Sequence, residues 1–128
     1  WGKPIFIAFV RGCRHTKGML DKNPEFTVNI PLGEIDPKIL SFCGTKSGRD
    51  VNKLEKLGLT LVPGETVSVP AIAELPLTLE CKVIYQQDQD LNLLNADDRN
   101  RCYPLGTVEE NNFHTAYYGE IVSAYIIR

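Results

Sequence analysis

The sequence predicts a mainly β domain of the α+β class. Its strands would curl into a small barrel, with short helices in the crossings between them. Three observations support this fold class. The apolar segments are short, several alternate with polar residues at the period of a β-strand, and strands and helices lack the regular alternation of a doubly wound sheet. A chain of 128 residues is long enough to enclose one hydrophobic core.

The first 30 residues predict two strands with a short helix between them. The segment Pro4–Val10 is apolar and rich in β-formers, which indicates a buried strand. A polar loop follows, and Thr16 is placed to cap a short helix that ends at Asn23 and Pro24. Polar and apolar residues then alternate over Glu25–Ile30, which predicts a second strand.

Two further short helices are predicted next. Asp36 followed by Pro37 is a favourable helix start, and the helix would turn Ile39, Leu40 and Phe42 inward. Asp50 is expected to cap a helix over Val51–Leu57, which Gly58 would end.

The remainder of the chain has β character. Pro70 interrupts Val67–Ile72, so we expect an edge strand there. The clearest strand is Leu77–Gln87, with Thr78, Glu80 and Lys82 on the face opposite its apolar residues. The polar stretch 88–112 predicts a loop with one helical turn. A long last strand over residues 114–128 would carry a bulge at Gly119. The prediction therefore contains five strands and two or three helices.

Composition excludes several classes of function. The net charge of −2 and the isoelectric point near 5.7 argue against a nucleic-acid surface, and no apolar run approaches the length of a membrane span. No secretory signal pattern is visible, so we expect a cytoplasmic protein. The four cysteines form no Cys-x-x-Cys pair and only two histidines are present, which argues against a structural zinc site and favours free thiols.

Two polar, glycine-bearing loops are candidate phosphate sites, because basic side chains lie beside backbone N–H groups at an expected helix start. In the first, Arg11, Arg14 and Thr16 would suit a phosphate monoester, with Cys13 and His15 between them. The alternative is an exposed turn with solvated arginines. The second loop contains Ser47, Gly48, Arg49 and Lys53, and its alternative is a plain capped helix. Neither loop has the P-loop pattern, so a nucleotide hydrolase is not implied.

His114 precedes the last predicted strand. A lone histidine at such a position is either a satisfied structural residue or a member of a site. A nucleophilic pair of His114 with Cys13 or Cys81 stays open as a third class of function, that of a cysteine hydrolase, although no protease signature surrounds these residues.

At these residues the chain resembles the flavin reductase-like family, the FMN-binding split barrels that include flavoredoxin. Each matching segment is weakly specific alone, and five in the right order are together fairly specific. They are Arg-Gly-Cys-Arg-His-Thr (11–16), Glu-Phe-Thr-Val-Asn-Ile-Pro (25–31), Ser-Gly-Arg-Asp-Val-Asn-Lys (47–53), Leu-Glu-Cys-Lys-Val (79–83) and His-Thr-Ala-Tyr-Tyr-Gly-Glu-Ile-Val (114–122).

The resemblance implies a split β-barrel over residues 1–128 that forms a homodimer and binds FMN noncovalently near the subunit interface. Family members have strands before the position of Trp1, so we expect the barrel of this chain to be incomplete at its N-terminus. His114 would be the catalytic residue near the flavin ring or the nicotinamide site. The implied cofactor-binding residues are Arg11, Arg14, His15, Thr16, Ser47, Gly48, Arg49 and Lys53.

The resulting hypothesis is an FMN-binding redox protein. It would be a flavin reductase or a flavoredoxin-like electron carrier that takes hydride from NADH or NADPH, with a redox protein as a further partner. The flavin would supply the chemistry and the protein the position and electrostatics. The alternative hypothesis is a binding module without catalysis, which carries flavin or another phosphate ligand or serves dimerisation.

Overall fold

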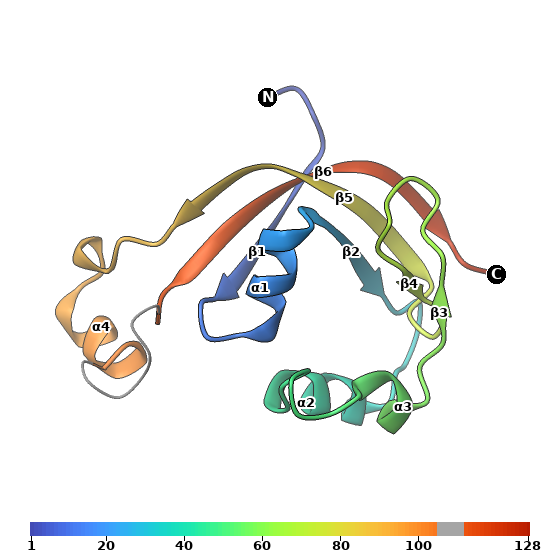
Figure 1. Cartoon of the computed structure of the whole chain (residues 1–128), viewed down its shortest axis with the longest axis horizontal. Coiled ribbons are helices and arrows are strands. Elements are labelled where there is room, and N and C mark those ends of the chain that lie inside the picture. Colours follow the sequence, from blue (N-terminus) through green and yellow to red (C-terminus); the bar gives the residue numbers. More distant parts are fainter. Residues whose placement is uncertain (105–111) are drawn as a thin grey trace.

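The structure, a computed structural model, describes residues 1–104 and 112–128. The described part is mainly β, with short helices between the strands (Figure 1). Its strands are β1 (Ile5–Arg11), β2 (Glu25–Ile30), β3 (Leu61–Val62), β4 (Ala71–Ile72), β5 (Leu77–Asp88) and β6 (His114–Ile126). Its helices are α1 (His15–Lys22), α2 (Pro37–Thr45), α3 (Lys53–Leu57), the 3-10 turn η1 (Leu91–Leu93) and α4 (Ala96–Cys102).

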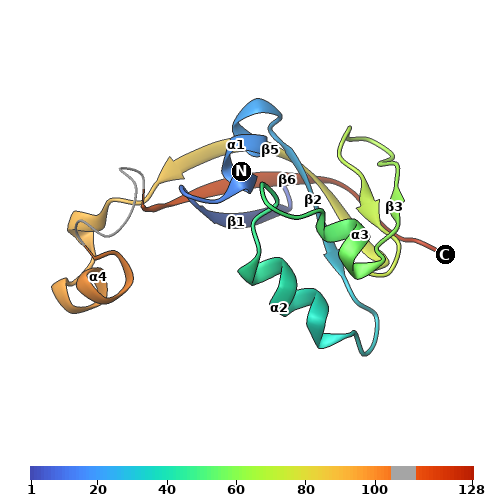
Figure 2. The same cartoon turned by 60° about the horizontal axis from the view of Figure 1, so that its bottom comes forward.

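Four antiparallel strands form one curled sheet in the order β1-β6-β5-β2. The sheet arches over α1, while α2 and α3 lie farther below the arch and α4 extends beyond the end of β5 (Figure 1). Turned forward, the same view separates α2 from the β3–β4 ribbon, which is a second, two-stranded sheet (Figure 2). The architecture is a curled half-barrel with a few short helices, so the predicted fold class is confirmed.

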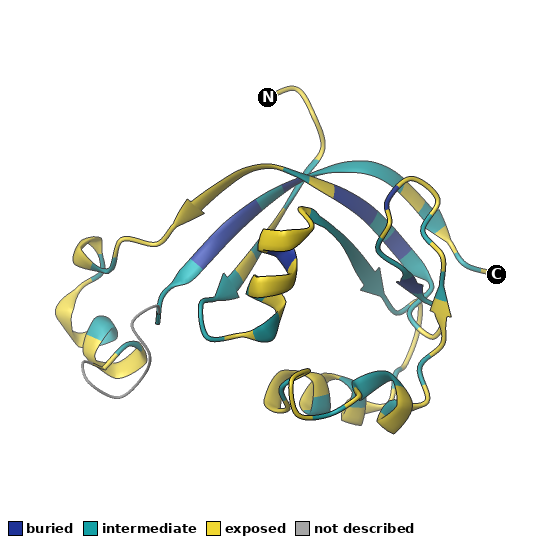
Figure 3. Cartoon of the chain, viewed as in Figure 1, coloured by how far each residue is buried: buried dark blue, intermediate teal, exposed yellow. Residues whose placement is uncertain are grey.

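The buried residues concentrate along the middle of β5 and β6 (Figure 3). Tyr117 and Cys81 have relative exposures of 1% and 0% there. Gly119 lets the edge of the Phe26 ring approach the sheet: a Cβ at this position would lie 2.6 Å from Phe26 Cζ. A side chain at Gly119 would therefore collide with the core, which is the physical reason for glycine here.

The predicted bulge at Gly119 is wrong, because Gly119 is paired with both neighbouring strands. The strand irregularities lie nearby. Ile84 of β5 is left unpaired between Val83 and Tyr85, and Val122 of β6 is left unpaired opposite the step from Glu80 to Cys81. These bulges add curvature to the long β5–β6 ribbon.

Two predicted helix caps are wrong. Thr16 lies inside the first turn of α1, since the helix begins at His15 with Arg14 as an N-cap residue that makes no side-chain cap bond. Asp50 lies in a turn in which its N–H donates to Ser47 O at 3.1 Å, and Asn52 caps α3 instead. The predicted caps at Asp36 and Gly58 agree with the structure, where Gly58 has a φ of 64°.

Helix α2 contacts the rest of the chain through one narrow face. Ile39 and Phe42 are half-buried as predicted. Leu40, which was expected to point inward, is 71% exposed because it lies on the outer side of the helix. Strand β1 also differs from the prediction of a buried strand. It is an edge strand of the sheet, and Phe9 on it is 69% exposed.

The segment 65–70 is not a strand, and only Ala71–Ile72 of the expected Val67–Ile72 is paired. The reason is that carboxylates accept its N–H groups: Glu80 binds those of Thr66 and Val67, and Glu25 binds that of Ser68. On the face of β5 that was predicted as polar, Thr78 and Glu80 are consequently buried, each with an exposure of 0%, whereas Lys82 is exposed.

The stretch 88–112 contains more helix than the predicted single turn. Both η1 and α4 lie there, and the Asn95 side chain caps α4 by accepting from Asp98 N. Residues 105–111 of this predicted loop lie outside the described residues. The short strand β3 was not predicted. Over residues 1–104 and 112–128, none of the helices has the length and apolar character needed to cross a membrane.

Candidate functional site

A pocket of about 550 Å³ lies where the end of β1, the start of α1 and the α2–α3 connection meet. We call it the basic pocket. All nine of the candidate residues from the sequence line it, although they come from three separate parts of the chain. They are Arg11, Arg14, His15, Thr16, Ser47, Gly48, Arg49, Lys53 and His114.

Contacts between the two loops hold the basic pocket together. The Arg49 guanidinium donates from Nη1 to Cys13 O at 3.1 Å, which ties the α2–α3 connection to the β1–α1 turn. Gly48 packs closely on the imidazole of His15, and a Cβ at Gly48 would lie 3.2 Å from His15 Cδ2. The turn itself is fixed to the residue before β6 by the bond from Gly12 N to Phe113 O. The two loops therefore form one wall.

The charge of the basic pocket is strongly positive. Among its described lining residues the only acidic side chain is Asp50, against the lysines and arginines Arg11, Arg14, Lys46, Arg49 and Lys53. The whole chain, in contrast, has a formal net charge of −2. Positive charge is thus concentrated at this pocket in an otherwise slightly acidic protein, which is the electrostatic pattern of an anion site.

These five cations differ in whether the protein already engages them. Lys53 Nζ donates to Cys43 O at 2.8 Å, Arg49 binds Cys13 O, and Arg11 donates to Cys102 O and to Asn112 Oδ1. Within the described part of the chain, the side chains of Arg14 and Lys46 make no hydrogen bond or ion pair. These two cations are therefore free to bind a ligand, while the others also brace the loops.

Lys46 was missed by the sequence reasoning, which began the second loop at Ser47. It is the C-cap residue of α2, and its N–H donates to Phe42 O. A signal was present, because a lysine directly before a Ser-Gly-Arg segment extends the same basic loop by one residue. Phe9 was missed as well, because its strand was predicted to be buried.

His114 lies between the basic pocket and a second pocket of about 500 Å³. Its Nδ1 is 2.6 Å from the hydroxyl oxygen of Tyr103. Burial lowers the pKa of His114, and the positive charges of Arg11 and Arg14 lower it further. The imidazole is therefore neutral at physiological pH, and a neutral imidazole can donate a hydrogen bond from one ring nitrogen and accept one at the other.

The cysteine-hydrolase hypothesis receives no support from Cys81. Its side chain has an exposure of 0%, and burial raises its pKa to about 11. A nucleophilic cysteine needs the opposite shift. Cys13 lines the basic pocket, and all four cysteines are free thiols. Among the described residues, no group of three or more histidine, cysteine, aspartate or glutamate side chains is placed to hold a metal ion.

Comparison with protein families gives a match over almost the whole chain. The model described as "Flavin reductase like domain" matches residues 3–128. Among curated proteins, an uncharacterized protein of Archaeoglobus fulgidus is 41% identical over 71 residues, which are 56% of this chain and 40% of that protein. A second, from Pyrococcus abyssi, is 36% identical over 75 residues, 59% of this chain and 42% of that protein.

Solved structures show the same fold. The flavoredoxin of Desulfovibrio vulgaris (Miyazaki F) is 26% identical with a TM-score of 0.70, and the match covers 96% of this chain and 53% of that one. The flavoredoxin of Methanosarcina acetivorans is 25% identical with a TM-score of 0.67, covering 98% and 54%. An FMN-binding protein from Thermus thermophilus, at 19% identity, has a TM-score of 0.65, covering 97% and 55%. The chain thus spans about half the length of these proteins.

Proposed function

The chain belongs to the flavin reductase-like domain family, and on that premise we propose that it binds FMN noncovalently, with the phosphate group in the basic pocket. One observation carries the proposal: two loops from distant parts of the chain bring five cations to one pocket, and Arg14 and Lys46 among them have no protein partner in the described residues. A phosphate dianion is the kind of group that such unpaired cations bind.

The residues present fit a phosphate ester. The Arg14 guanidinium and the Thr16 hydroxyl, on the first loop, would donate to phosphate oxygens. Ser47 and Gly48 on the second loop offer a hydroxyl and an approachable backbone. Arg11, Arg49, Lys53 and His15 would brace the two loops and add to the positive field, and His114 would lie nearer the flavin ring.

We propose a redox role for the bound flavin. FMN supplies the capacity to accept hydride, and the chain supplies the site that holds it. NADH or NADPH would be the transient electron donor, and a redox protein or free flavin the acceptor. The similarity to flavoredoxins at 25–26% identity supports this choice over hydrolysis.

The direct test is reconstitution with FMN, followed by desalting and a visible absorption spectrum. We expect a retained flavin band, and we expect Arg14→Ala to weaken FMN binding by about 1.5–3 kcal/mol, roughly 10- to 100-fold. The matched control is Arg101→Ala, since Arg101 is exposed on α4 and its side chain bonds, among the described residues, only to Asp98. A colourless folded protein would contradict the proposal. Equal weakening by both variants would remove Arg14 from the site.

Addition of NADH and, separately, NADPH to the FMN-loaded protein tests the redox step. Loss of the absorbance of the reduced nicotinamide, together with bleaching of the flavin, would support a reductase. Flavin binding without oxidation of either nucleotide would favour the alternative, a flavin-carrying module that receives electrons elsewhere.

We also propose that two copies of the chain associate. Strand β1 is an edge of the sheet, and Ile7 and Phe9 on its outer face are 38% and 69% exposed. Trp1 lies over Tyr85 and Tyr118 of the same face and is 72% exposed. Exposed apolar side chains next to a free strand edge favour pairing with another chain. Light scattering after size-exclusion chromatography should give twice the monomer mass, and a monomer across the accessible concentration range would refute the proposal.

A further inference from the structure

His114 is held by an arrangement that reaches beyond the basic pocket. His114 is the first residue of β6, and it is paired in the sheet with Arg11, the last residue of β1. Residues paired in this way project from the same face, so the Arg11 and His114 side chains emerge side by side. Both line the basic pocket, and His114 also lines the second pocket.

Tyr103 provides the third member of this arrangement. It directly follows α4 as its C-cap residue, and its N–H donates to Arg99 O. Its ring stands edge-on to the imidazole of His114, with centroids 5.7 Å apart and planes at 87°. Its hydroxyl oxygen lies 2.6 Å from His114 Nδ1. Tyr103 lines the second pocket and is not among the residues of the basic pocket.

Arg11 contacts the Tyr103 ring, the residue before Tyr103, and Asn112. Its guanidinium carbon lies 4.8 Å from the centre of the Tyr103 ring, a cation–π distance. Nη2 donates to Cys102 O at 2.7 Å, immediately before Tyr103, and Nε donates to Asn112 Oδ1 at 2.6 Å, two residues before His114. A planar, forked guanidinium is needed to make all these contacts together, and a lysine ammonium cannot replace it.

We propose that Tyr103 is a positioning residue which fixes the ring orientation and the tautomer of His114, and that Arg11 acts with it by holding Tyr103 in place. The importance of this arrangement for electron transfer rests on the proposed FMN function. The positioning of His114 by Tyr103 and Arg11 does not depend on that function. In this assignment the Tyr103 hydroxyl donates to His114 Nδ1, across the 2.6 Å that separates the two atoms. The proton of the neutral imidazole is then on Nε2, which is left as a donor at the junction of the two pockets.

The electrostatic surroundings agree with this assignment. Burial and the charges of Arg11 from β1 and Arg14 before α1 keep the pKa of His114 below its ordinary value. Asp88, at the end of β5, also lines the second pocket but its Oδ1 accepts from the Thr115 hydroxyl. The tautomer matters only while the imidazole is neutral, because the charged ring carries a proton on both nitrogens.

The measurement is a long-range ¹H–¹⁵N spectrum of the histidine side chains in the protein without added flavin. Only His15 and His114 contribute, so His15→Gln assigns the signals. We expect His114 to show the Nε2–H tautomer in the wild type. Tyr103→Phe should give a mixture of tautomers and raise the His114 pKa by about half a unit to one unit, because the neutral form loses an accepted hydrogen bond.

Tyr85→Phe is the matched control, since the Tyr85 hydroxyl donates to Gln87 Oε1 and not to His114. Arg11→Lys keeps the positive charge but loses the forked contacts, so it should also mix the tautomers while circular dichroism stays native. A wild-type Nδ1–H tautomer, or a Tyr103→Phe spectrum like that of the wild type, would overturn the role of Tyr103. An Arg11→Lys spectrum like that of the wild type would overturn the role of Arg11.

The same variants separate this inference from the proposed function. Because Tyr103 does not line the basic pocket, Tyr103→Phe should leave the FMN dissociation constant within about two-fold. The pH profile of NADH or NADPH oxidation should move to higher pH by the same amount as the His114 pKa. A protein that binds no FMN would refute the proposed function and still report the tautomer.

Discussion

Two polar regions of this chain differ in how completely the protein satisfies them. In the first, which we call the Glu80 cradle, one buried carboxylate accepts from the backbone N–H groups of residues 65–67 and from two hydroxyls. The distances to Glu65 N, Thr66 N, Thr66 Oγ1 and Tyr125 Oη are 2.6–2.7 Å, and that to Val67 N is 3.2 Å. In the second, the basic pocket, the side chains of Arg14 and Lys46 make no hydrogen bond within the described residues.

The difference indicates which polar groups serve the fold and which can serve a ligand. A buried charge is tolerated only when hydrogen bonds replace its hydration, and Glu80 has them all. It has no capacity left for another molecule. Cations gathered at a pocket without partners repel one another, and an anion would relieve that repulsion. The predictions below test this division.

The largest effect is expected for Glu80→Ala. The change would leave the N–H groups of Thr66 and Val67 and the Tyr125 hydroxyl without their acceptor, so the free energy of unfolding should fall by about 3–5 kcal/mol. Urea unfolding measures it. FMN affinity of the protein that remains folded should not change, because Glu80 is not among the pocket residues.

Glu74→Ala is the control for this prediction. Glu74 also accepts from a backbone N–H, that of Thr60, but its side chain is exposed, so the loss should be much smaller than that for Glu80→Ala. Equal losses of unfolding free energy for the two variants would show that burial of Glu80 adds nothing to the stability. A strong loss of FMN affinity in Glu80→Ala would contradict the division between the two regions.

Acid unfolding should report the same carboxylate. Hydrogen bonds from Thr66 and Tyr125 and from the N–H groups of Glu65 and Thr66 outweigh burial and lower the pKa of Glu80 to about 2, from 4.5 in the unfolded chain. A lowered pKa stabilises the folded state above the unfolded value. This contribution, about 3 kcal/mol, is therefore complete above pH 4.5 and disappears as the pH falls towards 2.

Unfolding free energies measured from about pH 6 down to about pH 1.5 check this expectation, because this range brackets the unfolded and folded pKa values of Glu80, about 4.5 and about 2. Glu25, whose pKa is also lowered, chiefly by bonds from Ser68, adds to the slope in the same direction. The comparison of wild type with Glu80→Gln isolates Glu80, because the amide does not titrate. Parallel curves for the two proteins would contradict the assignment.

The Glu80 cradle also shows what the sequence could not reveal. The alternation over Leu77–Gln87 predicted the strand correctly, and a glutamate on its polar face would ordinarily face solvent. The part of that face around Glu80 is buried because the 65–70 segment folds over it, and this contact is 13 to 15 residues distant in sequence. Local periodicity predicts the strand, but tertiary contacts decide which segment covers its face.

The nine candidate residues do lie together in one pocket, whereas two of the predicted helix caps around them are wrong. The residue types of a phosphate-binding loop are visible locally, and the ordered family segments joined two loops that the fold does bring to one pocket. The caps depend on φ and ψ of single residues, and Thr16 and Asp50 each lie two positions from the observed N-cap residue. Tyr103 carried no local signal, because its role depends on a contact with His114 across the chain.

A smaller effect is expected for Lys46→Ala. Lys46 is exposed, and its ammonium is a point charge without the fork of Arg14, so FMN affinity should fall by about 1 kcal/mol, roughly five-fold. The loss should shrink at high ionic strength. Lys56→Ala on α3 removes the same charge outside the pocket lining and should have no measurable effect. Equal losses would indicate a general field and not a contact of Lys46.

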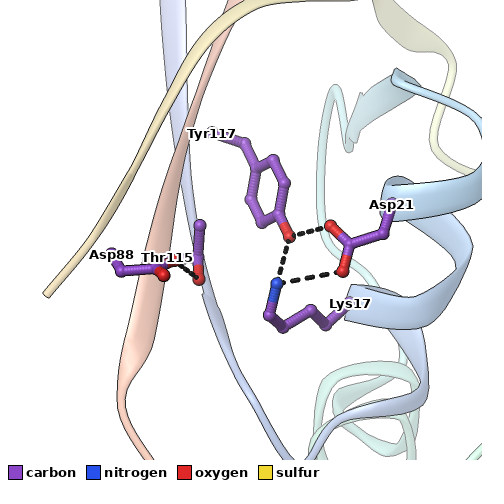
Figure 4. Close-up of polar contacts among 5 residues, drawn as sticks. All are labelled: Lys17, Asp21, Asp88, Thr115 and Tyr117. Atoms are coloured by element: carbon purple, nitrogen blue, oxygen red, sulfur yellow. Dashed lines mark hydrogen bonds and ion pairs between the residues drawn. The ribbon is translucent and has the colours of Figure 1, made fainter. Parts of the chain in front are cut away.

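The smallest effect is expected where the fold supports the pocket without touching the ligand. The Tyr117 hydroxyl donates to Asp21 Oδ1 at 2.7 Å and accepts from Lys17 Nζ at 3.0 Å, and Lys17 and Asp21 form an ion pair (Figure 4). This cluster, together with the buried side chain of Leu20, fastens α1 to the sheet. The first turn of α1 carries pocket residues, so the cluster positions them.

Tyr117→Phe should lower the free energy of unfolding by only about 1 kcal/mol, because Lys17 and Asp21 still form their ion pair and stay partly accessible to water. FMN affinity should fall by no more than about three-fold, through greater freedom of α1. Tyr118→Phe, one residue on, is the control, since its ring packs against Trp1 and Tyr85 on the opposite face. Tyr117→Phe could instead weaken FMN binding as much as Arg14→Ala. In that case Tyr117, which lies outside the pocket, would affect FMN affinity as strongly as a cation without a protein partner. The completeness of hydrogen bonding would then no longer separate the two regions.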